Sequence, residues 1–352
     1  MKKSTQLTHL ALCLLFSLTA LFGLIRWQAH PPLKSYHIRG YGQGTTYSIT
    51  YFAEDSIVSQ NNIDSIITSI DSSLSLYKSY SLINRFNGAS RGLQPDLHLR
   101  HVVKEALRIF KTSGGIFDIT VQPLVSLWGF GKVKPDSLPG SKQIAHALKS
   151  VGSGKLRLTS DSLVKMVPSV TIDLNGIAQG YTVDVICRFL DNRKISNYLV
   201  ELGGEVRVRG AKAGGEAFTI GIESPAENAY AESIVRQTIS LNRGAITTSG
   251  NYRNFYTSGG KIISHLIDPR TGYSINNEMI SASVWAPEAM TADGYDNVLM
   301  GMGIKKALLF MKRQRNMEAY FIYRKPNGTI ADTATAGFQK MFKNQHSAPA
   351  SH

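Results

Sequence analysis

The spacing of apolar residues predicts strands and amphipathic helices in the first third of the chain. Apolar and polar residues alternate over residues 47–52, which is the period of a half-buried strand. Residues 57–74 and 102–110 instead carry apolar side chains at the spacing of one helix face. We therefore expect a strand followed by two helices, each of which packs one face against a core.

The rest of the chain alternates less regularly between the two kinds of element. Strands are expected at residues 170–172, 198–208 and 217–222, and helices at residues 177–190 and 291–302. The first of these strands stops at Asp173, and the second is interrupted by Gly203 and Gly204. Thr291 is the candidate N-cap of the last helix. This irregular order favours an α+β fold over a regular βαβ series.

The N-terminus has the pattern of an export signal. Two lysines at positions 2 and 3 precede an apolar stretch over residues 10–25, which ends at Arg26. The stretch is short for a spanning helix, and no small-residue cleavage site follows it. An uncleaved membrane anchor is the preferred interpretation, with a cleaved signal peptide as the alternative. The basic start predicts that everything after Arg26 lies outside the cytoplasm.

These features predict three parts of the chain. Residues 1–34 form the signal or anchor with a stiff linker at residues 30–32, residues 35–341 the folded domain, and residues 342–352 a loose polar tail.

Composition narrows the class of protein. The 352 residues are 43% hydrophobic and 18% charged, which is typical of a globular protein with a sizeable core. The net charge of +14 suggests an anionic partner, but the basic residues are scattered and no nucleic-acid-binding motif accompanies them. We therefore expect no nucleic acid among the partners. Cys13 and Cys187 lie in an apolar run and a predicted helix, so no internal disulfide is expected.

Three oxygen-bearing side chains share one face of the last predicted helix. Asp293, Asp296 and Asn297 stand at positions i, i+3 and i+4, while the opposite face carries an apolar stripe. Close carboxylates repel each other unless a cation or a proton compensates, and hard oxygen ligands suit Mg²⁺ or Ca²⁺. A solvated polar face is the competing interpretation.

Three further segments are candidates for ligand contact. Residues 173–180 place an acid before a glycine-containing turn into a helix, although they lack the dinucleotide-binding fingerprint. Residues 264–272 place His265 before a turn, where an imidazole can accept a hydroxyl proton. Residues 115–131 combine aromatic, apolar and acidic side chains, as a planar ring system would require. A structural turn, a structural histidine and an ordinary core are the respective alternatives.

The combination and order of these segments resemble the ApbE family of FAD:protein FMN transferases. The resemblance runs from about Gly44 to Gly303. It is carried by residues 44–45, 76–78, 84–87, 117–131, 173–180, 202–204, 248–253, 265–272 and 292–297.

The resemblance implies an ApbE-like α+β fold, with mixed sheets and packed helices, and a flavin site. Mg²⁺ would be held by Asp293, Asp296, Asn297 and the carbonyl of Gly176. FAD, the substrate, would lie near Gln43, Tyr77, Lys78, Phe117, Asp118, Asp173, Gln179 and Ile267. His265 is the candidate for taking the proton of the acceptor hydroxyl, with Asp268 as a second candidate or an orienting group.

The implied reaction attaches FMN by a phosphoester bond to a Thr or Ser of an acceptor protein and releases AMP. By analogy with the family, the acceptor is a membrane redox subunit, and the enzyme is anchored to the inner membrane with its domain in the periplasm. Two alternatives use the same residues: an FAD-binding carrier without transfer, and a Mg²⁺-dependent FAD pyrophosphatase that gives FMN and AMP. A basic, anchored surface-binding protein would explain the charge but not the motifs.

The chain departs from the family pattern at a few positions. Asn297 stands where the family most often has Thr or Ser, so altered metal affinity is expected rather than loss of the site. Gln179 stands where the family often carries a charged residue. No lipobox precedes Cys13, which argues against a lipid anchor but not against export.

Overall fold

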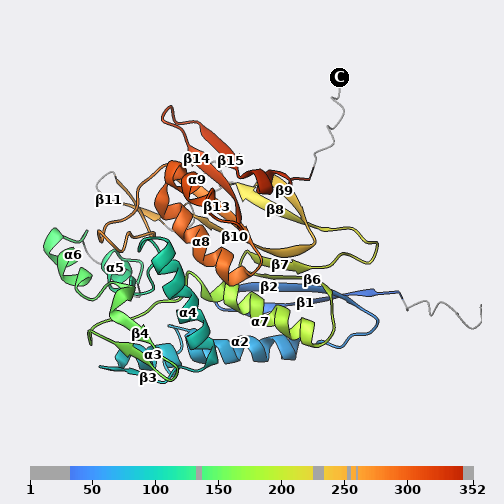
Figure 1. The fold of residues 1–352 in the computed structure, drawn as a ribbon, viewed down its shortest axis with the longest axis horizontal. Helices are drawn as coiled ribbons and strands as arrows, with labels where there is room; N and C mark the ends of the chain where they lie inside the picture. The colour runs from blue at the N-terminus through green and yellow to red at the C-terminus, as the bar shows by residue number, and fades with distance from the viewer. Residues whose placement is uncertain (1–31, 132–136, 225–233, 252–254, 259–260, 344–352) are drawn as a thin grey trace, which may run out of the picture.

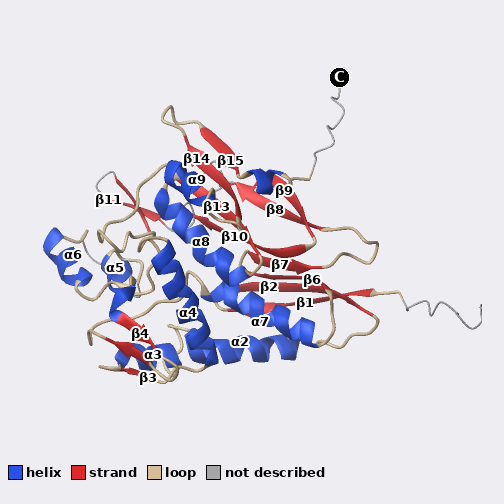
Figure 2. Ribbon diagram, viewed as in Figure 1, coloured by secondary structure: helices blue, strands red, loops and turns tan. Residues whose placement is uncertain are grey.

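The fold is organised around one large antiparallel sheet. The computed structural model describes residues 32–131, 137–224, 234–251, 255–258 and 261–343. Within these residues, eight strands form the sheet in the order β1-β2-β6-β7-β10-β13-β14-β15, as Figures 1 and 2 show. They are β1 (Lys34–Gly42), β2 (Thr45–Ala53), β6 (Asn197–Leu202), β7 (Glu205–Arg209), β10 (Arg243–Gly250), β13 (Met279–Ala286), β14 (Glu318–Arg324) and β15 (Ile330–Ala334).

The predicted strands at 47–52 and 198–208 are confirmed as parts of this sheet. In β2, Tyr47, Ile49 and Tyr51 are buried, so the alternation in the sequence marks the face that packs on the helices. The predicted interruption at Gly203 and Gly204 is a hairpin turn between β6 and β7. Both glycines have positive φ, 66° and 109°, which side chains other than glycine rarely adopt.

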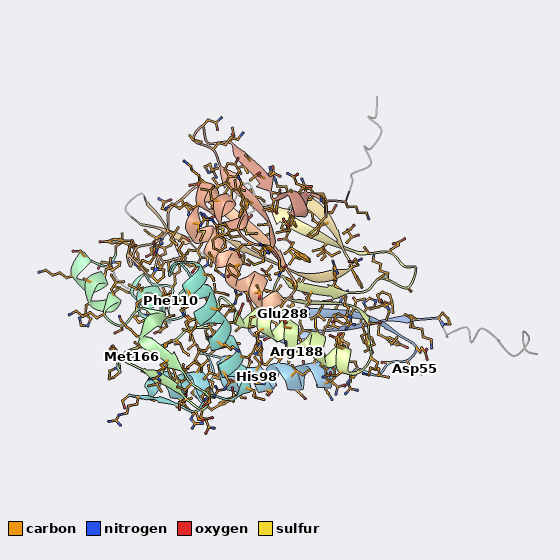
Figure 3. The ribbon with its side chains drawn as sticks, in the orientation of Figure 1. Asp55, His98, Phe110, Met166, Arg188 and Glu288 are labelled. Carbon is orange, nitrogen blue, oxygen red and sulfur yellow. The ribbon has the colours of Figure 1, made fainter. Side chains whose placement is uncertain are left out.

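Four long helices cover one face of the sheet (Figure 1). They are α2 (Gln60–Leu74), α4 (Leu97–Thr112), α7 (Ala178–Asn192) and α8 (Ala289–Met302). Apolar side chains of α2 and α7 pack on β2 and β6, and those of α4 and α8 form a second cluster against β13 and β14. His98 on α4 (Figure 3) shares a hydrogen bond of 2.8 Å with the Tyr181 hydroxyl on α7. The four helices therefore form one layer.

A two-stranded hairpin covers the opposite face. It consists of β8 (Phe218–Ser224) and β9 (Ile234–Leu241), and its inward side chains pack on Val206, Ile246 and Tyr320. Lys343, at the start of the predicted tail, donates its N–H to the carbonyl of Thr238 on β9. The end of the described chain therefore extends this ribbon.

Smaller elements complete the fold beside the helical layer and along the sheet edge. They are α3 (Leu82–Gly88), β3 (Gly92–Leu93), α5 (Gln122–Leu127), α6 (Ser141–Leu148), η1 (Ser153–Lys155), β4 (Leu156–Leu158), β5 (Leu163–Lys165), β11 (Phe255–Ser258), β12 (Lys261–Ser264), α9 (Ile304–Met311) and α10 (Ala336–Gln339).

Several predicted elements differ from the structure in extent or kind. The helices predicted at 57–74, 102–110, 177–190 and 291–302 are confirmed with shifted ends, and the strand at 217–222 is β8. The strand predicted at 170–172 is wrong, because the Asn87 side chain bonds both the N–H and the carbonyl of Ile172 in place of a neighbouring strand. Thr291 is not the N-cap of α8, because that helix begins at Ala289 with Glu288 in the cap position.

The predicted anchor and most of the predicted tail lie outside the described residues, as do Cys13 and residues 252–254. In the described part of the chain, no helix is long and apolar enough to cross a membrane.

Candidate functional site

The two carboxylates of α8 are buried and face the start of α7. Asp293 and Asp296 are 5% and 1% exposed, so the solvated polar face considered above is excluded. Asp293 Oδ2 accepts a hydrogen bond of 2.9 Å from the N–H of Gly180. Asp296 Oδ1 accepts one of 3.0 Å from the Ser249 hydroxyl at the end of β10. The carboxylates therefore join α8 to a helix and a strand that are distant in the sequence.

Gly180 allows α7 and α8 to approach closely enough for this contact. A Cβ atom at this position would lie 2.5 Å from the carbonyl oxygen of Ala289 and 2.8 Å from Cβ of Asp293. Any other residue would push the two helices apart. The glycine-containing turn at residues 173–180 therefore places the backbone of α7 in contact with the Asp293 carboxylate, whether or not a ligand is present.

Burial and mutual repulsion make both carboxylates hard to ionise. Burial raises the pKa of Asp293 to about 7. The hydrogen bond from Gly180 acts to lower this pKa, and the negative charge of Asp184 acts to raise it further. Burial, followed by the charge of Asp293, raises the pKa of Asp296 well above its usual range. Within the described residues, neither carboxylate forms an ion pair with Lys, Arg or His. A bound cation would relieve this repulsion.

Asn297 and Gly176 complete an oxygen-rich set around these carboxylates. The Asn297 amide Nδ2 lies 3.4 Å from the carbonyl oxygen of Gly176 and 3.0 Å from both the Asp293 carbonyl and Asp296 Oδ1. No cluster of three or more His, Cys, Asp or Glu in the described chain is arranged to hold an ion. Two carboxylates, a carbonyl and an amide oxygen nevertheless suit Mg²⁺, which binds few protein oxygens and keeps several waters. The residues fit a Mg²⁺ site in which the amide turns its oxygen inward.

A cavity of about 570 Å³ opens beside these residues. Its lining includes five of the predicted flavin residues together with His265: Phe117, Asp118, Asp173, Gln179 and Ile267. Phe130 also lines it and contacts the His265 ring edge-on, with centroids 6.1 Å apart. Trp128 instead belongs to a buried cluster and donates its indole N–H to Gly272. The aromatic segment therefore supplies both cavity wall and ordinary core.

The acidic side chains near this cavity have different surroundings. The Asp118 carboxylate accepts hydrogen bonds from the N–H and hydroxyl groups of Thr120 and Ser153, so it holds its own loop in place. Asp173 accepts from the N–H of Asn175, and burial raises its pKa.

Asp268 is paired with Arg270 rather than with His265 in the described contacts. The guanidinium donates to both carboxylate oxygens, at 2.9 and 2.7 Å, and the Arg270 N–H adds a third hydrogen bond. Burial acts to raise the pKa of Asp268, but the hydrogen bonds from Arg270 outweigh it and lower the pKa. His265 lies in the wall of the cavity, whereas Asp268 is not among its lining residues. Of the two catalytic candidates, His265 has the better access to a bound ligand.

The remaining predicted flavin residues line a second cavity of about 950 Å³. Gln43, Tyr77 and Lys78 lie here, and Gln43 donates from its amide to Asp71 and Thr182 at 3.3 and 3.0 Å. Asn175 and Gln179 line both cavities, so the two spaces adjoin at the start of α7. All predicted flavin and metal residues except the buried Asp296 therefore line one of these two adjoining cavities.

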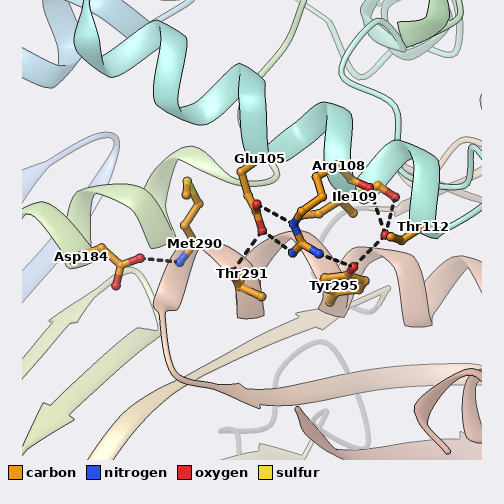
Figure 4. A network of polar contacts seen from close by, with 8 residues as sticks. All are labelled: Glu105, Arg108, Ile109, Thr112, Asp184, Met290, Thr291 and Tyr295. Atoms are coloured by element: carbon orange, nitrogen blue, oxygen red, sulfur yellow. Dashed lines mark hydrogen bonds and ion pairs between the residues drawn. The ribbon is translucent and has the colours of Figure 1, made fainter. Parts of the chain in front are cut away.

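Sequence reasoning missed a residue that positions α8. The Asp184 carboxylate on α7 accepts a hydrogen bond of 2.9 Å from the N–H of Met290 (Figure 4). It also accepts one of 2.9 Å from the N–H of Ala289 and pairs with Arg207. Thr291 on α8 donates its hydroxyl to Glu105 on α4, and Glu105 also pairs with Arg108 of its own helix (Figure 4). The sequence signal for Asp184 was an aspartate on the apolar face of a predicted helix, because a buried aspartate needs a partner. Glu205, which lines the 570 Å³ cavity, carried no comparable signal.

The sequence and the fold both match known proteins. Residues 43–321 match the ApbE family. The chain is 35% identical over 321 residues to the FAD:protein FMN transferase of Haemophilus influenzae, an alignment that covers 88% of this chain and 92% of that protein. It is 36% identical over 284 residues to the FAD:protein FMN transferase of Vibrio cholerae, which covers 79% and 84% respectively.

Solved structures agree with the sequence matches. The flavin transferase ApbE from Vibrio cholerae has a TM-score of 0.79 at 33% identity and covers 88% of this chain and 100% of that one. The Pseudomonas stutzeri flavinyl transferase ApbE, in its apo form, has a TM-score of 0.79 at 30% identity and covers 88% and 97%.

Proposed function

The chain belongs to the ApbE family, and we propose that this flavin transferase moves the FMN half of FAD onto a Thr or Ser hydroxyl of an acceptor protein. One observation carries the proposal. The two adjoining cavities share Asn175 and Gln179, next to Gly180, whose N–H bonds to Asp293, so an elongated ligand spanning both would place its middle near that carboxylate. FAD is elongated, and its central pyrophosphate is the group that the transfer reaction cleaves.

The lining of the cavities supports a division of FAD between them. Phe117, Phe130 and Ile267 give the 570 Å³ cavity the apolar and aromatic wall that suits a flavin ring. The adenosine half of FAD would then occupy the 950 Å³ cavity, whose lining includes Gln43, Tyr77 and Lys78. Under this arrangement Asp118 acts by holding the loop that forms the wall, and Gln179 lies where the two halves join.

The residues of α8 supply the metal site. Asp293, Asp296, Asn297 and the carbonyl of Gly176 would hold Mg²⁺, for the oxygen chemistry described above. Mg²⁺ bound there would neutralise negative charge on the pyrophosphate and on the departing phosphate. Ser249 and Gly180 fix the two carboxylates by hydrogen bonds, so their positions are set before a ligand arrives.

His265 completes the chemistry by removing a proton. The acceptor hydroxyl oxygen attacks the phosphorus on the FMN side, and the phosphorus–oxygen bond to AMP breaks as the phosphoester forms. His265 accepts the hydroxyl proton, and AMP leaves as an anion. Asp268, held by Arg270, orients the loop that carries His265 rather than exchanging a proton itself.

We propose the cellular location from the N-terminal sequence. The basic and apolar N-terminal segment supports a protein anchored in the inner membrane with its catalytic domain in the periplasm. The acceptor on that side would be a membrane redox subunit.

Intact mass measurement tests the proposal. The chain is incubated with FAD, MgCl₂ and a candidate acceptor domain, and the acceptor is then examined by mass and by in-gel flavin fluorescence. A mass increase equal to FMN that disappears with EDTA is expected. Free FMN and AMP without a labelled acceptor would favour a pyrophosphatase, and intact bound FAD would favour a carrier.

A further inference from the structure

Among the strands that the structure describes, none pairs with one side of the last part of β10, next to the candidate site. The pairing of β10 with β7 ends at Ile246 opposite Val206, whereas its pairing with β13 continues to Gly250 opposite Ser281. Among the described strands, the last part of β10 is therefore paired on the β13 side alone. The β6–β7 hairpin turns back at Gly203 and Gly204, so no described strand continues the line of β7 beyond this point.

The backbone of this stretch presents polar groups to the open side. Asn251 donates its N–H to the carbonyl of Ile280 on the β13 side. Because successive residues of an extended strand direct their N–H and carbonyl groups to opposite sides, those of Gly250 and Thr248 point away from β13. They point toward the open line of β7. This geometry is a template for one more strand.

The open stretch connects the candidate site to a third cavity. This cavity of about 270 Å³ lies between the sheet and the β8–β9 hairpin, and Thr248 and Gly250 line both it and the 570 Å³ cavity. Its wall carries four aliphatic side chains, Val206, Ile220, Ile222 and Ile246, together with the acidic Glu201 and Glu223. On the other face of the same stretch, the Ser249 hydroxyl bonds to Asp296. One face of an added strand would thus meet the carboxylates of α8, and the other a pocket with aliphatic and acidic walls.

We propose that an extended segment of the acceptor protein docks here as an additional strand along residues 247–250 of β10. The inference rests on the proposed function, since it names how the acceptor reaches the site. A strand paired with β10 lies about 4.8 Å away, and its side chains alternate between the two faces. The Thr or Ser to be modified projects on the Ser249 face, toward Asp296.

The alternation also sets the sequence that the site prefers. The residues immediately before and after the modified hydroxyl residue project toward the 270 Å³ cavity on the opposite face. The aliphatic part of the wall favours small or aliphatic side chains there, and Glu201 and Glu223 disfavour acidic ones. A folded surface cannot follow both faces of one strand, so the occupant is an extended segment, as in other proteins that bind peptides by strand addition.

A peptide library on beads tests the preference. Each bead carries one short peptide with a central Thr and random flanking residues, and the beads are incubated with the full chain, FAD and MgCl₂ and sorted by flavin fluorescence. Labelled peptides are expected to carry small or aliphatic residues on both sides of the Thr. Labelling without any preference at these two positions would overturn the proposal.

Backbone methylation of one labelled peptide tests the strand pairing directly. Each peptide N–H is replaced in turn by N-methyl, which removes a donor and blocks close approach. Loss of a hydrogen bond costs about 1 kcal/mol, so methylation of every second position is expected to reduce labelling roughly fivefold or more, and methylation of the intervening positions much less. An absence of alternation would exclude strand pairing.

A matched pair of variants on β8 locates the groove. Ile222→Trp fills the 270 Å³ cavity, whereas Thr219→Trp adds the same ring to the exposed face of β8. Ile222→Trp is expected to raise KM for the labelled peptide at least about tenfold, while the Kd for FAD stays within about twofold. Thr219→Trp is expected to leave both unchanged. Equal KM values for the two variants, each shown to be folded by thermal melting, would contradict the placement.

Failure of the proposed function gives a different result. If the chain binds FAD but neither cleaves it nor labels any protein or peptide, the transferase assignment falls and the docking inference with it. If it labels a folded acceptor but no library peptide, the transferase stands and the extended-segment proposal is wrong.

Discussion

The carboxylate of Asp184 accepts a hydrogen bond of 2.9 Å from the N–H of Ala289, so a side chain of α7 caps the first turn of α8. The residue in the cap position, Glu288, makes no side-chain cap. A negative charge at a helix N-terminus is favourable because the unpaired N–H groups there carry partial positive charge. The start of α8, and hence the orientation of Asp293 one turn later, depends on this contact between helices.

Replacement of Asp184 tests how strongly the site depends on this contact. Asp184→Asn breaks the buried pair with Arg207 and weakens the cap, so we expect the free energy of unfolding to fall by about 3 kcal/mol. Asp191→Asn on the same helix weakens a partly exposed pair with Arg209 and keeps an oxygen that can accept from Tyr198, so the free energy of unfolding is expected to fall by less than about 1 kcal/mol. Urea unfolding measures both. Similar losses for the two variants would show that the Asp184 cap is not important.

Close packing of α7 on α8 predicts a strong effect at Gly180. Gly180→Ala introduces a Cβ atom 2.5 Å from the Ala289 carbonyl, and such overpacking costs about 1–3 kcal/mol. It should also reduce Mg²⁺ affinity, because Asp293 moves with α8. Gly88→Ala, at the end of α3 with open space around it, is the control and is expected to be neutral or slightly stabilising. Denaturant unfolding and calorimetric Mg²⁺ titration distinguish the outcomes.

The raised pKa of Asp293 predicts that stability depends on pH in the absence of metal. An aspartate in the unfolded chain has a pKa of about 4, whereas burial raises that of Asp293 to about 7. Between these values the folded protein holds a proton that the unfolded chain has released. The contribution of Asp293 to the free energy of unfolding therefore falls as pH rises through this window, by at most about 1.4 kcal/mol per unit.

Mg²⁺ should reverse this trend, since it replaces the proton. The increase in Tm caused by Mg²⁺ is expected to grow between about pH 6 and pH 8. Thermal melting with and without MgCl₂ measures it, and Asp293→Asn should flatten both dependences. A Mg²⁺ effect that is independent of pH would contradict the raised pKa.

Asn297 predicts a weakened metal site. Its amide donates to the Gly176 carbonyl and to Asp296 Oδ1, two of the oxygens proposed to hold Mg²⁺, so it competes with a cation for them. Asn297→Thr removes the amide and leaves a hydroxyl ligand, and we expect Mg²⁺ to bind roughly threefold to tenfold more tightly. Isothermal titration calorimetry measures the change. Asn192→Thr, an exposed position at the other end of α7, is the control. Weaker binding by Asn297→Thr would show that competition from the amide N–H group does not limit the affinity.

His265 should be needed for transfer more than for FAD binding. Loss of a general base typically costs about 100-fold to 10,000-fold in rate, so His265→Ala should bind FAD but transfer FMN at least 100-fold more slowly. The exposed His146 on α6 provides the control variant. Single-turnover labelling of an acceptor, together with FAD fluorescence titration, separates the two effects. Wild-type turnover by His265→Ala would remove this residue from the proton transfer.

Local patterns in the sequence predicted most of the elements but not their arrangement. Alternation found β2, and helical spacing found α2, α4, α7 and α8, because each element carries its own apolar face. The error at residues 170–172 arose because a side chain, Asn87, supplies the hydrogen bonds that a strand neighbour would supply. The misplaced N-cap at Thr291 has the same origin, since the cap comes from α7.

The candidate site shows the same limit. The spacing of Asp293, Asp296 and Asn297 predicted that they share a face, and the family resemblance indicated the residues that surround them. Neither could predict that Ser249 bonds to Asp296 or that Ser153 bonds to Asp118, since both contacts depend on how distant segments pack.

The long-range contacts of the site bear on the order in which the protein folds. Gly180 and Asp293 are 113 positions apart in the chain, and α8 packs on β10 and β13, which are distant from α7 in the sequence. Contacts between distant segments form slowly because a large loop must first close. The site is therefore complete only after the C-terminal part of the domain is in place. FAD and the proposed Mg²⁺ would stabilise a completed fold rather than nucleate it.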